Sequence, residues 1–263
     1  MRLFKSQEDK EQIDSARAHY EKFISAAATA SPQQAKALAG SFVSKPELVA
    51  LSEKERARRG ADAFRGYAEN VLADDCLTAD EEDAFTEIAQ ALGVEQEQFD
   101  TTFRDVLRRM VVARANDGRL PEVQSPHLIP KKNEVVHQES AAGLMKEVVL
   151  REFRAGYSGF SFPIAKGIRY RTGSARGHTV VVGTDLQAED TGMLAVTSQR
   201  IAYMGSRKSM EIPFSKLMNL DVFTDGIRFH ASNRQKAPLF KMEEGMGDVI
   251  AATINAAIKR FNE

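Results

Sequence analysis

The sequence predicts an α+β protein in which an all-α half precedes a β-rich half. Three observations carry this prediction. Apolar residues recur every three or four positions up to about residue 115, they alternate from residue 156 onward, and a proline-containing stretch separates the two patterns. The 263 residues are long enough for two domains with separate cores. We therefore expect a helical domain over 1–120, a linker over 121–133 and a β domain over 134–263.

The first half predicts amphipathic helices separated by short turns. We expect them over residues 1–30, 47–73, 78–92 and 96–115. The third has the clearest start, because Thr78 and Glu81 have the spacing of a capping box and acidic residues crowd its first turn. It should end at Gly93, which favours an antiparallel pair of helices joined by Gly93 and Val94.

The second half predicts about seven short strands at roughly ten-residue spacing, closed by one helix over 246–261. Thr224-Asp225-Gly226 indicates a hairpin turn. Before the strands, residues 141–153 are apolar at helical spacing, and 173–178 read as a polar loop. The expected architecture is a seven-stranded antiparallel β-barrel capped by a C-terminal α-helix.

The clearest pair of strands lies in 190–213. Apolar residues stand at alternate positions in both strands, Met193 and Ala195 in the first and Ile201 and Tyr203 in the second. A short polar turn ending in Arg200 joins the two strands. This stretch therefore predicts two neighbouring strands of a binding-type β domain.

Composition and charge narrow the class of protein. Hydrophobic content of 43% and charge of 28% are ordinary for a soluble protein, and no apolar run reaches the roughly 20 residues that span a bilayer. The lone Cys76 excludes an internal disulfide, so we expect a cytoplasmic protein. Residues 1–140 carry 19 Lys or Arg and 25 Asp or Glu, whereas 141–263 carry 17 and 12. The second half is therefore the one expected to meet an anionic surface.

Three runs of the second half resemble the PH/GRAM-like (pleckstrin-homology-like) domains of bacteria. They are Phe162-x-Ile164-x-Lys166-Gly167-x-Arg169-Tyr170-Arg171, Asp190-Thr191-Gly192-x-Leu194-x-Val196-Thr197-x-x-Arg200-Ile201 and Gly205-x-Arg207-Lys208-Ser209-x-x-Ile212-Pro213. The resemblance covers 134–263 and implies a barrel that binds lipid headgroups, peptides or neighbouring domains. In eukaryotic relatives the phosphoinositide site lies in the loop between the first two strands. Here that loop, 173–178, has only Arg176 and His178.

The first half resembles TerB-like helical domains over about 66–118, on the residues Leu77-Thr78-x-x-Glu81 and Ile88-Ala89-x-x-Leu92-Gly93. The resemblance implies a metal site at the acidic turn, with Asp74, Asp75 and Asp80 as ligands. These carboxylates lack EF-hand spacing, because the glycine and the final glutamate of a twelve-residue loop are missing. Helix capping and surface charge are the alternative reading.

Basic residues of the second half form the expected binding site, because guanidinium and ammonium groups bind phosphate and carboxylate oxygens. We place these residues on neighbouring strands and loops of the barrel: Lys166, Arg169, Arg171, Arg176, Arg200, Arg207 and Lys208. They predict a patch for an acidic protein partner or an anionic phospholipid; solvated charge is the alternative. For Arg200 the alternative is structural, a side chain that spans the barrel end and holds backbone carbonyls.

The sequence contains no nucleophile, phosphate-loop, zinc-protease or paired-cysteine motif. We therefore predict no enzyme and no cofactor, and the small basic excess without tryptophan argues against a nucleic-acid partner. The expected function is that of a non-catalytic adaptor in the cytoplasm or peripherally on the inner membrane. Its helical module would bind a protein, and its barrel would dock on a protein partner or an anionic membrane surface. The alternative is a metal-dependent regulatory or enzymatic protein using the turn at 74–80.

Overall fold

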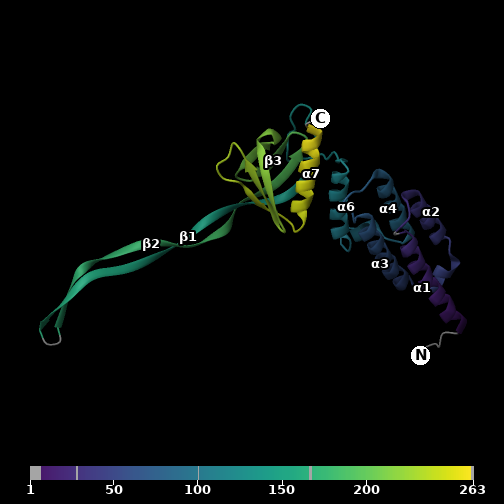
Figure 1. Cartoon of the computed structure of the whole chain (residues 1–263), viewed down its shortest axis with the longest axis horizontal. Helices are drawn as coiled ribbons and strands as arrows, with labels where there is room; N and C mark the ends of the chain where they lie inside the picture. Colours follow the sequence, from purple (N-terminus) through teal and green to yellow (C-terminus); the bar gives the residue numbers. More distant parts are fainter. Residues whose placement is uncertain (1–6, 28, 100, 166–167, 262–263) are drawn as a thin grey trace.

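The computed structural model describes residues 7–27, 29–99, 101–165 and 168–261 and confirms the α+β class (Figure 1). The first part is helical. Its α-helices are α1 (Gln7–Ala27), α2 (Pro32–Val43), α3 (Glu53–Val71), α4 (Ala79–Ala91), α5 (Gln96–Phe99) and α6 (Arg104–Asn116), with one 3₁₀ turn at Pro46–Ala50. The expected helix over 1–30 is thus α1, and the one over 96–115 is divided into α5 and α6. We call residues 7–116 the helical module.

Local sequence accounts for the helix ends in this module. Thr78 accepts a hydrogen bond from the Glu81 backbone, and the Glu81 carboxylate accepts one from the Thr78 backbone, so the predicted capping box is confirmed. Gly93 follows α4 with φ +72, a conformation that glycine adopts without strain. The module has its own core, centred on the fully buried Phe64, whose ring meets those of Phe85 and Phe103 edge to face.

The second part is a seven-stranded antiparallel sheet followed by one helix. Its elements are β1 (Val136–Ala165), β2 (Ile168–Thr197), β3 (Arg200–Gly205), β4 (Ser209–Pro213), β5 (Leu217–Phe223), β6 (Gly226–Ala231), β7 (Leu239–Lys241) and α7 (Met246–Phe261). The turn at Thr224 and Asp225 and the bounds of α7 agree with the sequence prediction.

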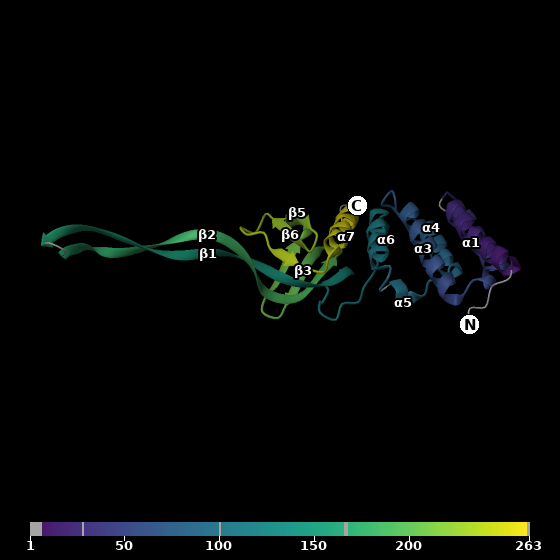
Figure 2. The same ribbon diagram turned by 90° about the horizontal axis from the view of Figure 1, so that it is seen from below.

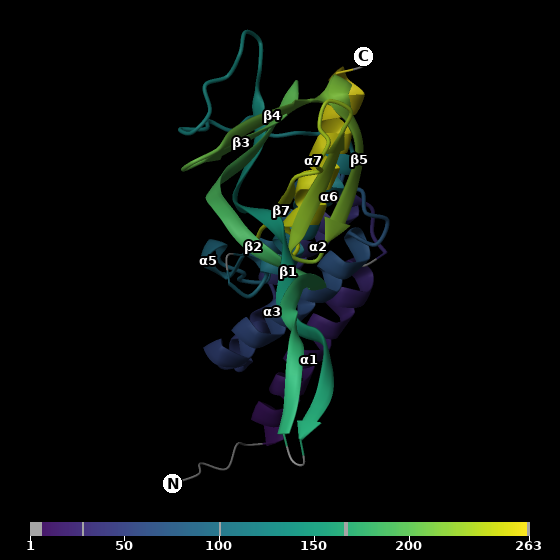
Figure 3. The ribbon, with the colours of Figure 1, turned by 90° about the vertical axis from the view of Figure 1, so that its left-hand side faces the viewer.

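The sheet is open, which corrects the expected closed barrel. The strand order is β4-β3-β2-β1-β7-β6-β5, so β4 and β5 are its two edges. Pro213 has no N–H to donate at the end of β4, and the 3₁₀ turn Phe214–Lys216 separates β4 from β5. Figure 3 shows the curved sheet with β4 and β5 on either side of α7.

Side chains from the sheet and α7 form a second core, separate from that of the helical module. Leu194 and Val196 of β2 belong to this second core, and they pair with Tyr203 and Ile201 of β3. The core side of β2 is therefore one residue out of phase with the predicted Met193 and Ala195, because a shift of one residue exchanges the two faces of a strand. From α7, Ile250 and Ile254 are fully buried against this sheet.

The longest strands, β1 and β2, form a two-stranded ribbon that extends from the sheet on the side away from the helical module (Figures 1 and 2). Residues 141–153, expected at helical spacing, belong to β1, and the expected loop 173–178 lies within β2. Both expectations were wrong for one physical reason. Each segment pairs with a distant strand, Gly159 with Gly173 and Ala155 with Gly177, and local periodicity does not reveal that partner.

Two helices join the helical module to the sheet. In Figures 1 and 2, α7 lies between the sheet and α6. Arg104 donates to the Glu243 carboxylate at 2.9 Å, Arg108 pairs with the same carboxylate at 2.5 Å, and the Arg260 guanidinium donates to the Gly118 carbonyl at 2.7 Å. The segment just before α7 is thus bound to α6, and the last turn of α7 is bound to the residues that follow α6.

Candidate functional site

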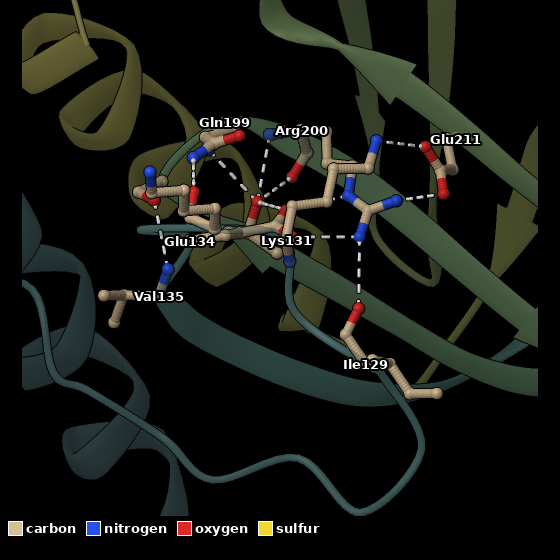
Figure 4. A network of polar contacts seen from close by, with 10 residues as sticks. Ile129, Lys131, Glu134, Val135, Gln199, Arg200 and Glu211 are labelled. Carbon is tan, nitrogen blue, oxygen red and sulfur yellow. Dashed lines mark hydrogen bonds and ion pairs between the residues drawn. The ribbon is translucent and has the colours of Figure 1, made fainter.

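Arg200, the first residue of β3, forms a buried ion pair with Glu134 (Figure 4). Its Nε and Nη2 atoms donate to the two carboxylate oxygens of Glu134 at 2.7 and 2.9 Å, a bidentate geometry. The side chains of Arg200 and Glu134 are 4% and 0% exposed. Arg200 also pairs with Glu211 and makes a long 3.5 Å contact with the Ile129 carbonyl. These contacts support the structural reading of Arg200.

Further donors hold the Glu134 carboxylate in place. The backbone N–H of Lys131 donates to it at 2.6 Å, and the Thr197 hydroxyl lies 2.7 Å from it and 3.0 Å from the Arg200 carbonyl, one of which takes the single proton. Burial alone raises the pKa of Glu134, but the donors from Arg200, Lys131 and Thr197 outweigh burial and hold the pKa below its ordinary value. The network fastens the loop before β1 to the β2–β3 turn. The sequence prediction omitted Glu134, which lies two residues before β1 and carries no motif that could have signalled it.

The turn that presents Arg207 and Lys208 is built around Asp190. The Asp190 carboxylate accepts hydrogen bonds from the Ser206 hydroxyl at 2.7 Å and from the backbone N–H groups of Arg207 and Lys208 at 3.1 and 2.8 Å. A Cβ on Gly205 would lie only 2.1 Å from the same carboxylate. The missing side chain of Gly205 therefore lets Asp190 reach the turn between β3 and β4.

The carboxylate of Asp190 should make the free energy of unfolding depend on pH. The Ser206 hydroxyl and then the backbone donors lower the pKa of Asp190 from 3.8 to about 2. A lowered folded-state pKa stabilises the fold above the unfolded pKa and loses that contribution as pH falls from about 4 to about 2. We expect Asp190→Asn to melt below the wild type at neutral pH and the gap to close over that window. Thermal unfolding across pH measures it; a gap unchanged by acid would contradict the assignment.

The basic residues predicted to form one patch are not brought together. Arg169, Arg171 and Arg176 lie on β2 in the far part of the ribbon, whereas Arg200 and Arg207 lie at the sheet (Figure 1). Lys166 lies outside the described residues. This corrects the expectation of neighbouring strands and loops, since β1 and β2 continue to pair where a turn into the barrel was expected.

The two cations of the β3–β4 turn differ in their ion pairs among the described residues. Lys208 pairs with Glu189 at 2.6 Å. Arg207 is exposed, and the described residues provide no partner for its side chain. The turn thus offers one unpaired guanidinium, which is too little for a phosphate site by itself.

The acidic turn before α4 makes local bonds. Asp74 accepts a hydrogen bond from the Cys76 backbone at 3.0 Å, Asp75 adopts φ 55, and Asp80 lies in the first turn of α4. Within the described residues, no three His, Cys, Asp or Glu side chains are grouped so that they could hold a metal ion. The metal site at Asp74, Asp75 and Asp80 therefore stays a prediction without support from this geometry.

A cavity of about 440 Å³ opens between the β2–β3 turn and the end of α7, with His137, Ser198 and Arg260 in its lining. These polar side chains already bond within the chain. His137 Nδ1 lies 2.7 Å from the Pro121 carbonyl, and Ser198 accepts from the Val135 backbone at 3.1 Å. Among the described residues of its lining, no buried side-chain polar atom lacks a hydrogen-bond partner, so no buried polar group indicates a ligand there.

Positive charge is concentrated in one segment. We call residues 148–184 of the sequence, which contain the paired segments 148–165 and 168–184, the outer ribbon. By sequence it contains six Lys or Arg and one Glu, a net charge of +5, while the rest of the second half is neutral. The chain outside the outer ribbon therefore has a net charge of −6. All the basic excess inferred for the second half belongs to the ribbon.

No protein-family model matches the chain, and no curated protein matches it. Among the described helices, none has the length and apolar content needed to cross a bilayer.

Proposed function

We propose that this chain is a non-catalytic adaptor whose outer ribbon docks on an acidic protein partner or an anionic membrane surface. The observation that carries the proposal is the +5 charge of the outer ribbon in a chain of net charge −1. Adaptor action of this kind takes place in the cytoplasm or peripherally on the inner membrane. The motifs of the two halves support a PH/GRAM-like identity for the sheet with α7 and a TerB-like identity for the helical module.

The length of the ribbon supports this function. Strands rise about 3.3 Å per residue, so β1 extends about 55 Å from residue 148 to its end at Ala165. The Debye length at physiological salt is about 8 Å. The acidic remainder of the chain is thus screened from a surface that meets the end of the ribbon, and the positive charge acts there without being cancelled.

A charge reversal on the ribbon tests the proposal. We expect the triple variant Arg169→Glu, Arg171→Glu, Arg176→Glu to lose at least about tenfold in capture of its partner, because each lost cation removes a charge-assisted contact. Capture from lysate with identification by mass spectrometry measures a protein partner. Flotation with phosphatidylglycerol vesicles measures a membrane surface.

The matched control reverses three exposed cations of the helical module, Lys54→Glu, Arg56→Glu and Arg58→Glu, none of which has an ion-pair partner among the described residues. It makes the same change in net charge away from the ribbon. Binding by the control and not by the ribbon variant supports the proposal. If wild type neither floats nor captures a protein, or if both variants lose binding equally, the proposal is wrong.

A further inference from the structure

In the part of the chain that the structure describes, no other strand pairs along either edge of the outer ribbon. Along the described part of the sheet, β1 pairs with β7 only over Gly143–Met145, and β2 pairs with β3 only over Gly192–Val196. Farther out, β1 and β2 pair only with each other. A two-stranded ribbon is marginally stable alone in water, and its unpaired edges readily bind other chains. The ribbon therefore leaves both of its edges available to another chain.

The helical module carries the opposite charge. Residues 7–116 contain 14 Lys or Arg and 21 Asp or Glu, a net charge of −7. Two of its helices, α1 and α3, carry exposed carboxylates without an ion pair among the described residues: Glu11, Glu21, Glu53, Asp62 and Glu69. The +5 ribbon and the −7 module are complementary surfaces of the same chain.

One molecule cannot bring these two surfaces together. The ribbon and the helical module extend from opposite sides of the sheet in both Figures 1 and 2. The ion pairs of Glu243, just before α7, with Arg104 and Arg108 of α6 hold the module on its side. The far end of the ribbon lies about 55 Å beyond its base, several Debye lengths, so attraction between that end and the module of the same molecule is screened.

We infer that the outer ribbon of one molecule docks on the acidic helical module of a second copy of this chain. The inference rests on the proposed function in taking the ribbon as a docking device, and it names the partner. If the contact is reciprocal, two copies related by a two-fold axis place each ribbon on the other's module, and the assembly closes as a dimer. Pairing through opposite charges makes the assembly dependent on salt.

Sedimentation velocity of the full chain tests the inference. At about 0.05 M salt the Debye length is about 14 Å, and at about 0.5 M it is about 4 Å. We expect a dimer at the lower salt that dissociates toward monomer at the higher salt. A chain that is monomeric at both concentrations of salt overturns the inference.

Two ribbon variants locate the contact. The triple variant Arg169→Glu, Arg171→Glu, Arg176→Glu should raise the dimer dissociation constant at least about tenfold. Because three charge reversals on β2 also change the strand itself, a second variant replaces residues 148–185 by an Asn-Gly turn between the paired residues Glu147 and Leu186. Both cores lie outside the deleted segment, so the remainder should fold and should be monomeric.

The control with Lys54→Glu, Arg56→Glu and Arg58→Glu should not raise the dimer dissociation constant. It makes the helical module more acidic, so the dimer should persist or tighten. A dimer that survives deletion of the ribbon, or a control that dissociates as much as the ribbon variant, overturns the inference. A monomeric chain that still loses vesicle or protein capture on reversal of the ribbon charges also overturns it, while leaving the proposed function standing.

Discussion

Arg200→Ala should lower the free energy of unfolding of the sheet by about 3–5 kcal/mol, because it leaves the Glu134 carboxylate buried without its counter-charge. The remaining donors, the Lys131 backbone and the Thr197 hydroxyl, satisfy lone pairs but supply no positive charge. Urea unfolding, followed by a spectroscopic signal from the sheet, measures the loss in free energy of unfolding. Arg207→Ala removes an exposed arginine from the next turn and should change stability by no more than about 0.5 kcal/mol.

Removing both charges should cost less than removing one. The double variant Arg200→Met, Glu134→Leu replaces the buried pair by apolar side chains of similar volume, which is often neutral or stabilising. We expect it to recover most of the stability lost in Arg200→Ala, because it leaves neither charge of the pair buried without the other. If the single variant loses less than about 1 kcal/mol, Glu134 reaches water or another cation, contrary to the buried geometry.

This ion pair shows where sequence reasoning stopped. Arg200 was recognisable as the end of a polar turn, and both a structural and a binding role were open. Glu134 lies 66 positions earlier and carries no motif, so only the folded chain brings the two together. Helix caps were predictable because Thr78 and Glu81 act within one turn. The limits of α7 were predictable for a similar local reason, its sustained apolar periodicity.

The ribbon marks the second limit. The glycines of 173–178 read as a loop because glycine favours turns, yet these positions pair with β1 in the structure. Strand pairing depends on a partner that local periodicity cannot specify, so the length of β1 and β2 was not predictable. The charge count of the two halves was correct, but the sequence alone did not show that the whole excess lies on one extended segment.

Gly60→Ala should destabilise the helical module by about 1–3 kcal/mol, although alanine is the better helix former. Gly60 is buried in α3, and a Cβ there would lie 2.1 Å from the Leu92 carbonyl oxygen at the end of α4. A backbone oxygen cannot rotate aside as a side chain can. The methyl group would therefore push α3 away from the end of α4 and disturb the packing around Phe64.

Gly40→Ala is the matched control, because Gly40 also lies in a helix but a Cβ there would meet nothing within 4 Å. It should stabilise the module by about 0.5–1 kcal/mol through helix propensity and the smaller entropy of the unfolded chain. Chemical unfolding followed by the circular dichroism of the helices compares the two. Opposite signs would establish the close approach of α3 to Leu92, whereas stabilisation by both substitutions would show that the helices are farther apart. Both substitutions add the same methyl group to a helix. The difference between their effects on the free energy of unfolding therefore separates the contact with Leu92 from helix propensity.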